Sequence, residues 1–312
     1  MSQADPHITV TCAPCCWGVD DVSNPHLPGW EKVLDEAALA GFGGLELGPY
    51  GYMPLDVARV GQALQARGLG IVAGTIFDDL VDPANRANLL RQTREICAFI
   101  TALPAPVRHE GQRHAAPYLT VMDWGHDERD FTAGHSDRAP RLSDADWAGM
   151  IANIRAISDC ARDEFGVRAT IHPHAGGFIE FEDELDRLAA DIDPETAGLC
   201  LDTGHLAYAG MDPVAVLRRY ADRLDYIHFK DIDATVFARV MGERIRFFEA
   251  CAQGVMCPIG RGNIDYRAVR ALLHEIGYAG YITIEQERDP RNADGVLADL
   301  AASRGFLAKT GF

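Results

Sequence analysis

Short apolar runs alternate with longer amphipathic stretches along the whole chain. The apolar runs are four or five residues long and rich in Ile, Leu, Val and Tyr, which is typical of strands buried on both faces. They lie at residues 8–12, 44–47, 70–73, 118–122, 169–172, 198–201, 226–229 and 281–285. The stretches between them repeat apolar residues at helical spacing, at 29–40, 55–67, 84–102, 143–165, 181–191, 213–223, 265–276 and 292–307. Eight strands alternating with eight helices predict an α/β fold, a (β/α)₈ TIM barrel.

Two glycine-rich phosphate-binding signatures are missing from the sequence. An open doubly wound sheet that binds dinucleotides would carry Gly-x-Gly-x-x-Gly after its first strand, and none follows residues 8–12. The Gly-x-x-x-x-Gly-Lys-Ser/Thr loop of nucleotide triphosphatases does not occur either. These absences favour the barrel over an open sheet.

The length of 312 residues fits one barrel domain over 1–312 with two insertions. One insertion covers about 104–140 and encloses the fourth strand, and the other covers about 232–257 with a helical pattern through 239–250. Insertions in barrels extend the loops of the active-site face, so we expect both to act as lids. The second one is equally compatible with contacting another subunit of a homo-oligomer.

The charge of the chain excludes some classes of partner. Lys and Arg number 29 against 46 Asp and Glu, a net charge of −17. Proteins that bind nucleic acid usually carry a basic face, so no nucleic-acid partner is expected. No apolar stretch reaches 18 residues, and Met1–Pro6 lacks the basic start of a signal peptide, so we expect no membrane contact. The eight cysteines are then expected as thiols in the cytoplasm.

Acidic and imidazole side chains recur where the predicted strands end. Because these ends surround one pocket in a barrel, the side chains should converge there. Several buried carboxylates are costly unless a cation neutralises them. Mixed carboxylate and imidazole ligands suit Mn²⁺, Co²⁺, Zn²⁺, Fe²⁺ or Mg²⁺, so a divalent metal is the predicted cofactor. The side chains are Glu46, His172, His174, Asp202, His205, His228, Lys230, Glu285 and Glu287.

Several motifs at these positions resemble those of a known family. They are residues 201–205 (LDTGH), 227–231 (IHFKD), 258–266 (PIGRGNIDY) and 284–287 (IEQE). The motifs resemble the xylose isomerase-like TIM-barrel superfamily, which contains sugar phosphate isomerases, epimerases and family 2 AP endonucleases. Within it, residues 46–54 (ELGPYGYMP) and 172–176 (HPHAG) look closest to inosose dehydratases. The resemblance spans about residues 8–290.

The resemblance implies a metal held by one residue from each of four consecutive strands. Asp202, His228 and Glu285 match three of the ligands of the family. Where many members have Glu at the end of the remaining strand, this chain has His172. We favour Glu180 as the fourth ligand, because a second neutral ligand would leave the ion less neutralised. His172 and His174 are the alternatives.

The implied chemistry is proton removal from the carbon next to a carbonyl in a keto sugar or cyclitol. Expelling a hydroxyl gives dehydration, as in inosose dehydratases, while returning the proton gives isomerisation or epimerisation. The candidates for acid–base work are His174, Lys230 and Glu287. The candidates for substrate contact are Trp17, Glu46, His172, His205 and Arg261.

Three other functions deserve comparison with a dehydratase. A sugar phosphate isomerase or epimerase would use the same ligands. An AP endonuclease would need a basic groove for DNA, which the net charge of −17 contradicts. A non-catalytic sugar-binding barrel would be favoured by loss of a ligand, yet Asp202, His228 and Glu285 are all present.

Overall fold

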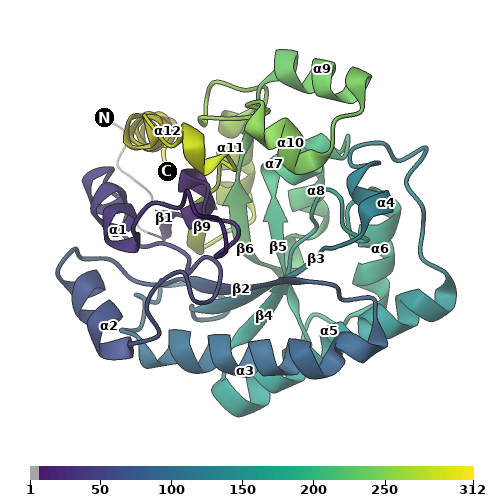
Figure 1. Cartoon of the computed structure of the whole chain (residues 1–312), viewed down its shortest axis with the longest axis horizontal. Helices are drawn as coiled ribbons and strands as arrows, with labels where there is room; N and C mark the ends of the chain where they lie inside the picture. Colours follow the sequence, from purple (N-terminus) through teal and green to yellow (C-terminus); the bar gives the residue numbers. More distant parts are fainter. Residues whose placement is uncertain (1–6) are drawn as a thin grey trace.

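The computed structural model of the chain describes residues 7–312. Met1–Pro6, on which the argument against a signal peptide rests, lies outside the described residues. Seven parallel strands form one curved sheet in the order β1-β9-β6-β5-β4-β3-β2, and helices surround it (Figure 1). The strands are β1 (Ile8–Cys12), β2 (Ala73–Asp78), β3 (Tyr118–Asp123), β4 (Arg168–Ile171), β5 (Gly198–Asp202), β6 (Leu224–Phe229) and β9 (Gly280–Ile284). The predicted α/β barrel is confirmed.

The barrel closes through the segment 44–47, which the sequence predicts as a strand. Only Leu45 makes strand-like pairs, as isolated parallel bridges to Cys12 at the end of β1 and to Ile71 ahead of β2. The segment approaches its neighbour closely, since a Cβ on Gly44 would lie 2.7 Å from the carbonyl oxygen of Gly70. Gly48, with φ +71°, then turns the chain away, so the eighth strand is reduced to a bridge.

The predicted strand at 70–73 is displaced towards the C-terminus. β2 begins at Ala73 and runs to Asp78, so the prediction overlaps it in one residue. Residues Thr75, Phe77 and Asp78 of β2 are only half-buried, which weakened the apolar signal used to place the strand.

The eight predicted helices are present, with ends shifted by at most four residues. They are α1 (Trp30–Leu39), α2 (Val57–Gln65), α3 (Arg86–Ala102), α5 (Asp144–Phe165), α6 (Glu182–Asp191), α8 (Pro213–Arg219), α11 (Tyr266–Glu275) and α12 (Val296–Thr310). Side-chain caps set several starts: Asp56, Asp212 and Asp265 each accept backbone N–H bonds from the first turn. Among residues 7–312, we find no helix with the length and apolar character that crossing a bilayer requires.

The first predicted insertion divides between the two ends of the barrel. Its residues before β3 lie at the amino end, where the ring of His109 hydrogen-bonds to Thr9 at the start of β1, and Tyr281 at the start of β9 donates to the carbonyl oxygen of Val107. The predicted lid role is therefore wrong for residues 104–117.

The remainder of the first insertion follows β3 with the short helix α4 (Asp127–Asp130) and meets the second insertion at the carboxyl end. The second contains α9 (Ala234–Glu243) and α10 (Phe247–Ala252) above the hairpin of β7 (Asp231–Ile232) and β8 (Met256–Cys257), close to α7 (Thr203–Tyr208) in Figure 1. Arg246 donates to the carboxylate of Asp130 at 2.5 Å and so joins α10 to α4.

The single helical pattern expected at 239–250 is wrong. The helix α9 ends at Arg244, whose φ of +58° places it in the left-handed region. A left-handed residue stops a helix by turning its backbone out of the hydrogen-bonded path. Apolar residues on both sides of the break face one small core, so their spacing resembles one continuous helix.

Candidate active site

Four predicted side chains meet at the carboxyl ends of neighbouring strands. They are His172 after β4, Asp202 on β5, His228 on β6 and Glu285 after β9, and the ligand atoms they offer all lie within 4.8 Å of one another. Asp202 Oδ2 lies 3.6 Å from His172 Nε2 and 3.8 Å from His228 Nδ1, and His228 Nδ1 lies 3.0 Å from Glu285 Oε2. All four are buried. We call them the four-residue cluster.

The four-residue cluster fits a divalent cation. Neither ring nitrogen of His172 has a hydrogen-bond partner among the described residues, although the side chain is buried. An unpaired buried imidazole is costly, whereas a nitrogen that binds metal is satisfied. Two imidazoles and two carboxylates form a donor set that Mn²⁺, Co²⁺, Fe²⁺ or Zn²⁺ accepts.

Glu46 orients one of these imidazoles. His228 Nε2–H donates to Glu46 Oε1 at 2.7 Å, and the hydroxyl of Tyr226 donates to the same oxygen at 2.7 Å. This leaves Nδ1 of His228 facing Asp202 and Glu285. A carboxylate on the far nitrogen of a ligating histidine fixes its tautomer and ring orientation. Glu46, expected to contact substrate, therefore acts on His228, and it also lines the cavity.

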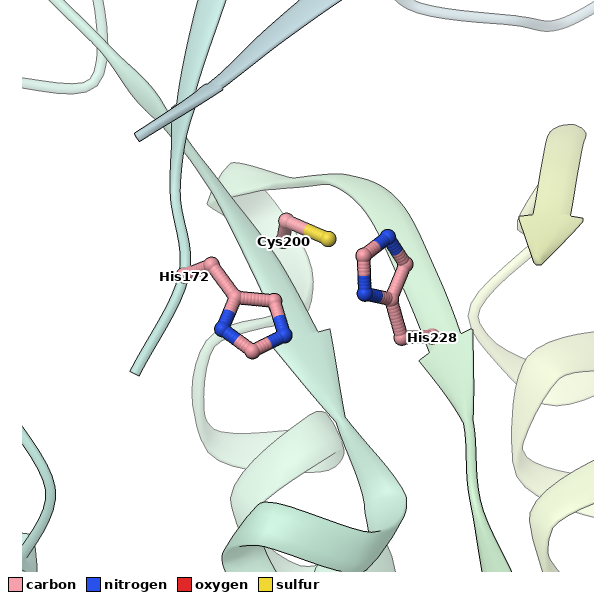
Figure 2. A group of neighbouring side chains, drawn as sticks. All are labelled: His172, Cys200 and His228. Atoms are coloured by element: carbon pink, nitrogen blue, oxygen red, sulfur yellow. The ribbon is translucent and has the colours of Figure 1, made fainter. Parts of the chain in front are cut away.

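Cys200 lies beside two members of the four-residue cluster, His172 and His228. It precedes Asp202 by two residues on β5, so both side chains point into the barrel. Figure 2 shows its sulfur directed towards the ring of His228, with His172 opposite, and the three could also hold an ion. Burial, the main cause, raises the pKa of the Cys200 thiol to about 12. A neutral thiol is a poor ligand, so we favour the carboxylate set.

Lys230 holds three carboxylates together. Its Nζ lies 2.7 Å from Asp202 Oδ2 and 3.0 Å from Glu287 Oε1, and it also bonds Glu285. Burial opposes the charge, but these neighbours raise the pKa of Lys230 well above its ordinary value. An ammonium that stays protonated cannot accept a proton. This position therefore gives Lys230 a counter-ion and positioning role and argues against its use as a base.

The backbone of Ala175 sets the tautomers of two histidines. His174 Nδ1–H donates to the carbonyl oxygen of Ala175 at 2.9 Å, so its Nε2 is a free acceptor. The N–H of Ala175 donates to His205 Nδ1 at 3.1 Å, so the Nε2 of His205 carries the hydrogen. The two rings lie 4.1 Å apart between centroids. His174 thus offers an acceptor and His205 a donor, side by side.

Glu287 completes a second group with these histidines. Its Oε1 lies 4.0 Å from His205 Nε2, and its Oε2 has no hydrogen-bond partner among the described residues. Burial, more than any other cause, raises the pKa of Glu287 to about 7. A carboxyl group in this range can both accept and release a proton near neutrality, which suits acid–base catalysis.

Glu180, favoured above as the fourth ligand, lies outside the four-residue cluster. Its Oε1 accepts the N–H of Gly134 at 2.7 Å, and its Oε2 accepts the N–H of Gly176 at 3.0 Å. Oε2 also lies 3.3 Å from Arg129 Nη2, and Arg129 binds Glu184 as well. These donors already satisfy the carboxylate, so Glu180 has no oxygen left to bind a metal. Its bond to Gly134 joins the first insertion to the barrel. His172 takes its place in the proposed ligand set.

The buried ion pairs of Arg129 give a stability prediction. Arg129→Met should lower the free energy of unfolding by about 3–5 kcal/mol, because Glu180 and Glu184 would stay buried without their cation. Metal affinity should not change, since this network is separate from the four-residue cluster. Urea unfolding and metal titration measure both quantities.

The matched control is Arg94→Met. Arg94 pairs with Glu164 on the surface, where such a pair contributes about 0–1 kcal/mol. If Arg129→Met removed metal binding and left stability intact, the Glu180 network would belong to the metal site after all.

Two predicted substrate contacts lie away from the cavity. Trp17 is fully buried, and its Nε1–H donates to Glu36 at 2.6 Å. The side chain of Arg261 is 66% exposed and lies 3.9 Å from Asp299. The structure therefore gives Trp17 a core position and Arg261 a surface position, and it brings neither to the other candidates.

One member of the four-residue cluster, Glu285, lines a cavity of about 430 Å³. The strand-end candidates Glu46, His174 and Glu287 line it as well, whereas His172, Asp202 and His228 are not among its lining residues. The lining also includes residues that the sequence did not reveal, namely Asp20, Tyr50, Phe77 and Phe248. Extending the strand beyond 73 with alternating side chains would have placed Phe77 on the cavity side, but no local signal separates Asp20 from other loop aspartates.

Comparison with known proteins places this architecture in a family. The family model described as xylose isomerase-like TIM barrel matches residues 34–308. An inosose dehydratase of Geobacillus thermodenitrificans is 30% identical over 303 residues, which cover 96% of this chain and 95% of that protein. The rhizopine catabolism protein MocC of Rhizobium meliloti is 31% identical over 317 residues, which cover 96% and 90%.

Solved structures agree on the fold. The IOLI protein, solved with a bound zinc atom, has a TM-score of 0.72 at 12% identity and covers 97% of this chain and 99% of its own. A D-allulose 3-epimerase from a Methylomonas species, in complex with D-allulose, has a TM-score of 0.68 at 19% identity, with full coverage of both chains. These identities support the fold alone, and the family model carries the assignment. The chain belongs to the xylose isomerase-like TIM-barrel family.

Proposed function

We propose that this protein is a metal-dependent lyase that dehydrates a keto cyclitol or a related keto sugar, as its inosose dehydratase relatives do by name. The observation that carries the proposal is one shared cavity. Glu285 of the four-residue cluster and the acid–base candidates His174 and Glu287 all line it. Dehydration next to a carbonyl needs both stabilisation of charge and transfer of a proton, and this cavity offers both.

The proposed metal ligands are His172, Asp202, His228 and Glu285. A bound Mn²⁺, Co²⁺, Zn²⁺, Fe²⁺ or Mg²⁺ would act as a Lewis acid for the negative charge that develops on the carbonyl oxygen. Lys230 keeps the carboxylates of Asp202 and Glu285 in place through its ammonium group.

The other residues handle the substrate and its protons. Glu287 accepts the proton from the carbon next to the carbonyl, since it lines the cavity and its Oε2 has no hydrogen-bond partner among the described residues. His174 accepts a hydrogen bond from a substrate hydroxyl through Nε2, and His205 donates one from its Nε2–H. Glu287, protonated in that step, returns the proton to the hydroxyl on the next carbon. The C–O bond breaks, the hydroxyl departs as water, and the electron pair of the broken C–H bond forms a C=C bond.

The proposal is tested with the enzyme reconstituted with Mn²⁺ or Co²⁺. Incubation with 2-keto-myo-inositol should consume the substrate and produce the ultraviolet absorbance of an enolised 1,2-diketone, the product of losing one water. The alternative is a sugar isomerase or epimerase, which the fold shared with D-allulose 3-epimerase favours. That alternative replaces the dehydratase if 2-keto-myo-inositol persists while a panel of ketoses is converted without loss of water.

Replacing Glu46 tests how the ligand His228 is positioned. Glu46→Gln should weaken metal binding about 10–100-fold, because the amide no longer anchors His228 as a carboxylate does. The dissociation constant is measured by calorimetry with Mn²⁺ or Zn²⁺. Glu31→Gln, an exposed glutamate on α1, serves as the control and should bind metal normally. Unchanged affinity in Glu46→Gln would remove Glu46 from the metal site.

A further inference from the structure

The cavity continues well past the four-residue cluster. Its volume of about 430 Å³ falls in the range of pockets that enclose drug-sized ligands, about 300–1,000 Å³. A keto cyclitol is a single six-membered ring. We propose that the substrate is an uncharged keto compound that carries a second sugar ring, and that this ring lies in the part of the cavity lined by Tyr50 and by Arg91, Gln92 and Glu95 of α3. The inference rests on the proposed function and specifies its substrate class.

The inner half of the cavity accounts for the first ring. Phe77 of β2 lies 5.0 Å from His174 between ring centroids, and Phe248 of α10 lies 6.3 Å from each of them. Trp124 stacks behind Phe77 at 5.2 Å and fixes its orientation. Phe77 and Phe248 are only half-buried, so a ring bound beside His174 would cover their faces.

The outer half of the cavity has a different character. Tyr50 provides an aromatic wall, and Arg91, Gln92 and Glu95 of α3 line the same cavity. Arg91 donates to Glu95 at 2.6 Å, and Gln92 donates through Nε2 to Asp78. These paired polar groups keep further donors and acceptors for hydroxyls. An aromatic face beside hydrogen-bonding groups matches the alternating apolar and hydroxyl surfaces of a sugar ring.

The charge of the lining disfavours a phosphate on this second ring. The carboxylates of Glu46, Glu95 and Glu285 are among the lining residues. Among the described lining residues, Arg91 is the one Lys or Arg, and Glu95 and Asn88 already engage both ends of its guanidinium. Like charges in a cleft repel an anion, so a phosphate ester should bind worse than the neutral compound.

The test compares substrates of one and two rings on the enzyme loaded with Mn²⁺. The compounds are 2-keto-myo-inositol, a glucoside of 2-keto-myo-inositol and a phosphate monoester of 2-keto-myo-inositol, each of which keeps a hydroxyl on a carbon beta to the carbonyl. The kcat/KM for the glucoside should exceed that for 2-keto-myo-inositol by about tenfold or more, and the phosphate should be at least about tenfold worse than 2-keto-myo-inositol. Tyr50→Ala and Arg91→Ala should each lower the two-ring to one-ring ratio by about tenfold.

Arg94→Ala is the matched control, because Arg94 lies on the same helix but pairs with Glu164 of α5, and the ratio should not change. A one-ring compound that reacts as well as the glucoside, a phosphate that reacts better, or an unchanged ratio in both cavity variants would overturn the inference and leave the dehydratase proposal standing. If none of the keto compounds reacts, and none binds to Glu287→Gln by calorimetry, the proposed function itself fails.

Discussion

Asp202→Asn is expected to abolish metal binding and to lower kcat/KM by at least about 10³-fold, since a metal that stabilises developing charge contributes several kcal/mol. Asp202 Oδ2 faces His172, His228 and Lys230 at the centre of the cluster. Asparagine would place an amide nitrogen where Oδ2 now lies, and an amide nitrogen does not bind a cation. Metal content by mass spectrometry and turnover of 2-keto-myo-inositol measure the two losses.

The fold should survive this substitution. Asp202 Oδ1 caps α7 by accepting the N–H groups of Gly204 and His205 at 2.7 and 2.9 Å, and the asparagine oxygen can do the same. The matched control is Asp212→Asn, because Asp212 caps α8 in the same way away from the cavity. Circular dichroism should show native helices in both variants. Full activity of Asp202→Asn would refute the metal assignment.

Glu287→Gln should lower kcat by about 10²–10⁴-fold and leave metal affinity close to that of the parent protein. Glutamine preserves the shape and can still accept a hydrogen bond from Lys230, but it cannot take up a proton. Metal titration and steady-state kinetics with 2-keto-myo-inositol separate the two effects.

The comparison variant is Glu285→Gln, two residues away on the same strand end. It should lose both metal and turnover, because Glu285 belongs to the four-residue cluster. If Glu287→Gln retains the turnover of the parent, the acid–base role passes to another residue, with His174 next in line because its Nε2 is a free acceptor.

The sequence predicts the barrel well because each strand and helix carries its own periodic signal. That signal fails where tertiary contacts decide the outcome. Gly44 fits against the backbone of Gly70, so the segment 44–47 closes the barrel through bridges and not as a full strand. Arg244 breaks a continuous helical pattern because both parts of the insertion face one local core.

Most of the candidate site is also visible in the sequence. Strand ends in a barrel converge, so the sequence alone groups Asp202, His228 and Glu285, and the structure brings them together. The need for negative charge around the ion favours Glu180 as the fourth ligand when only the sequence is known. The sequence does not show that Arg129, 51 residues away, pairs with Glu180 in a separate buried network.

The central claim is that a divalent cation sits among side chains from four consecutive strand ends. Crystals grown with Mn²⁺ and measured at the manganese absorption edge test it most directly. The account predicts one anomalous peak bonded to His172, Asp202, His228 and Glu285. A peak at any other group of side chains, or no peak at saturating Mn²⁺, would contradict it.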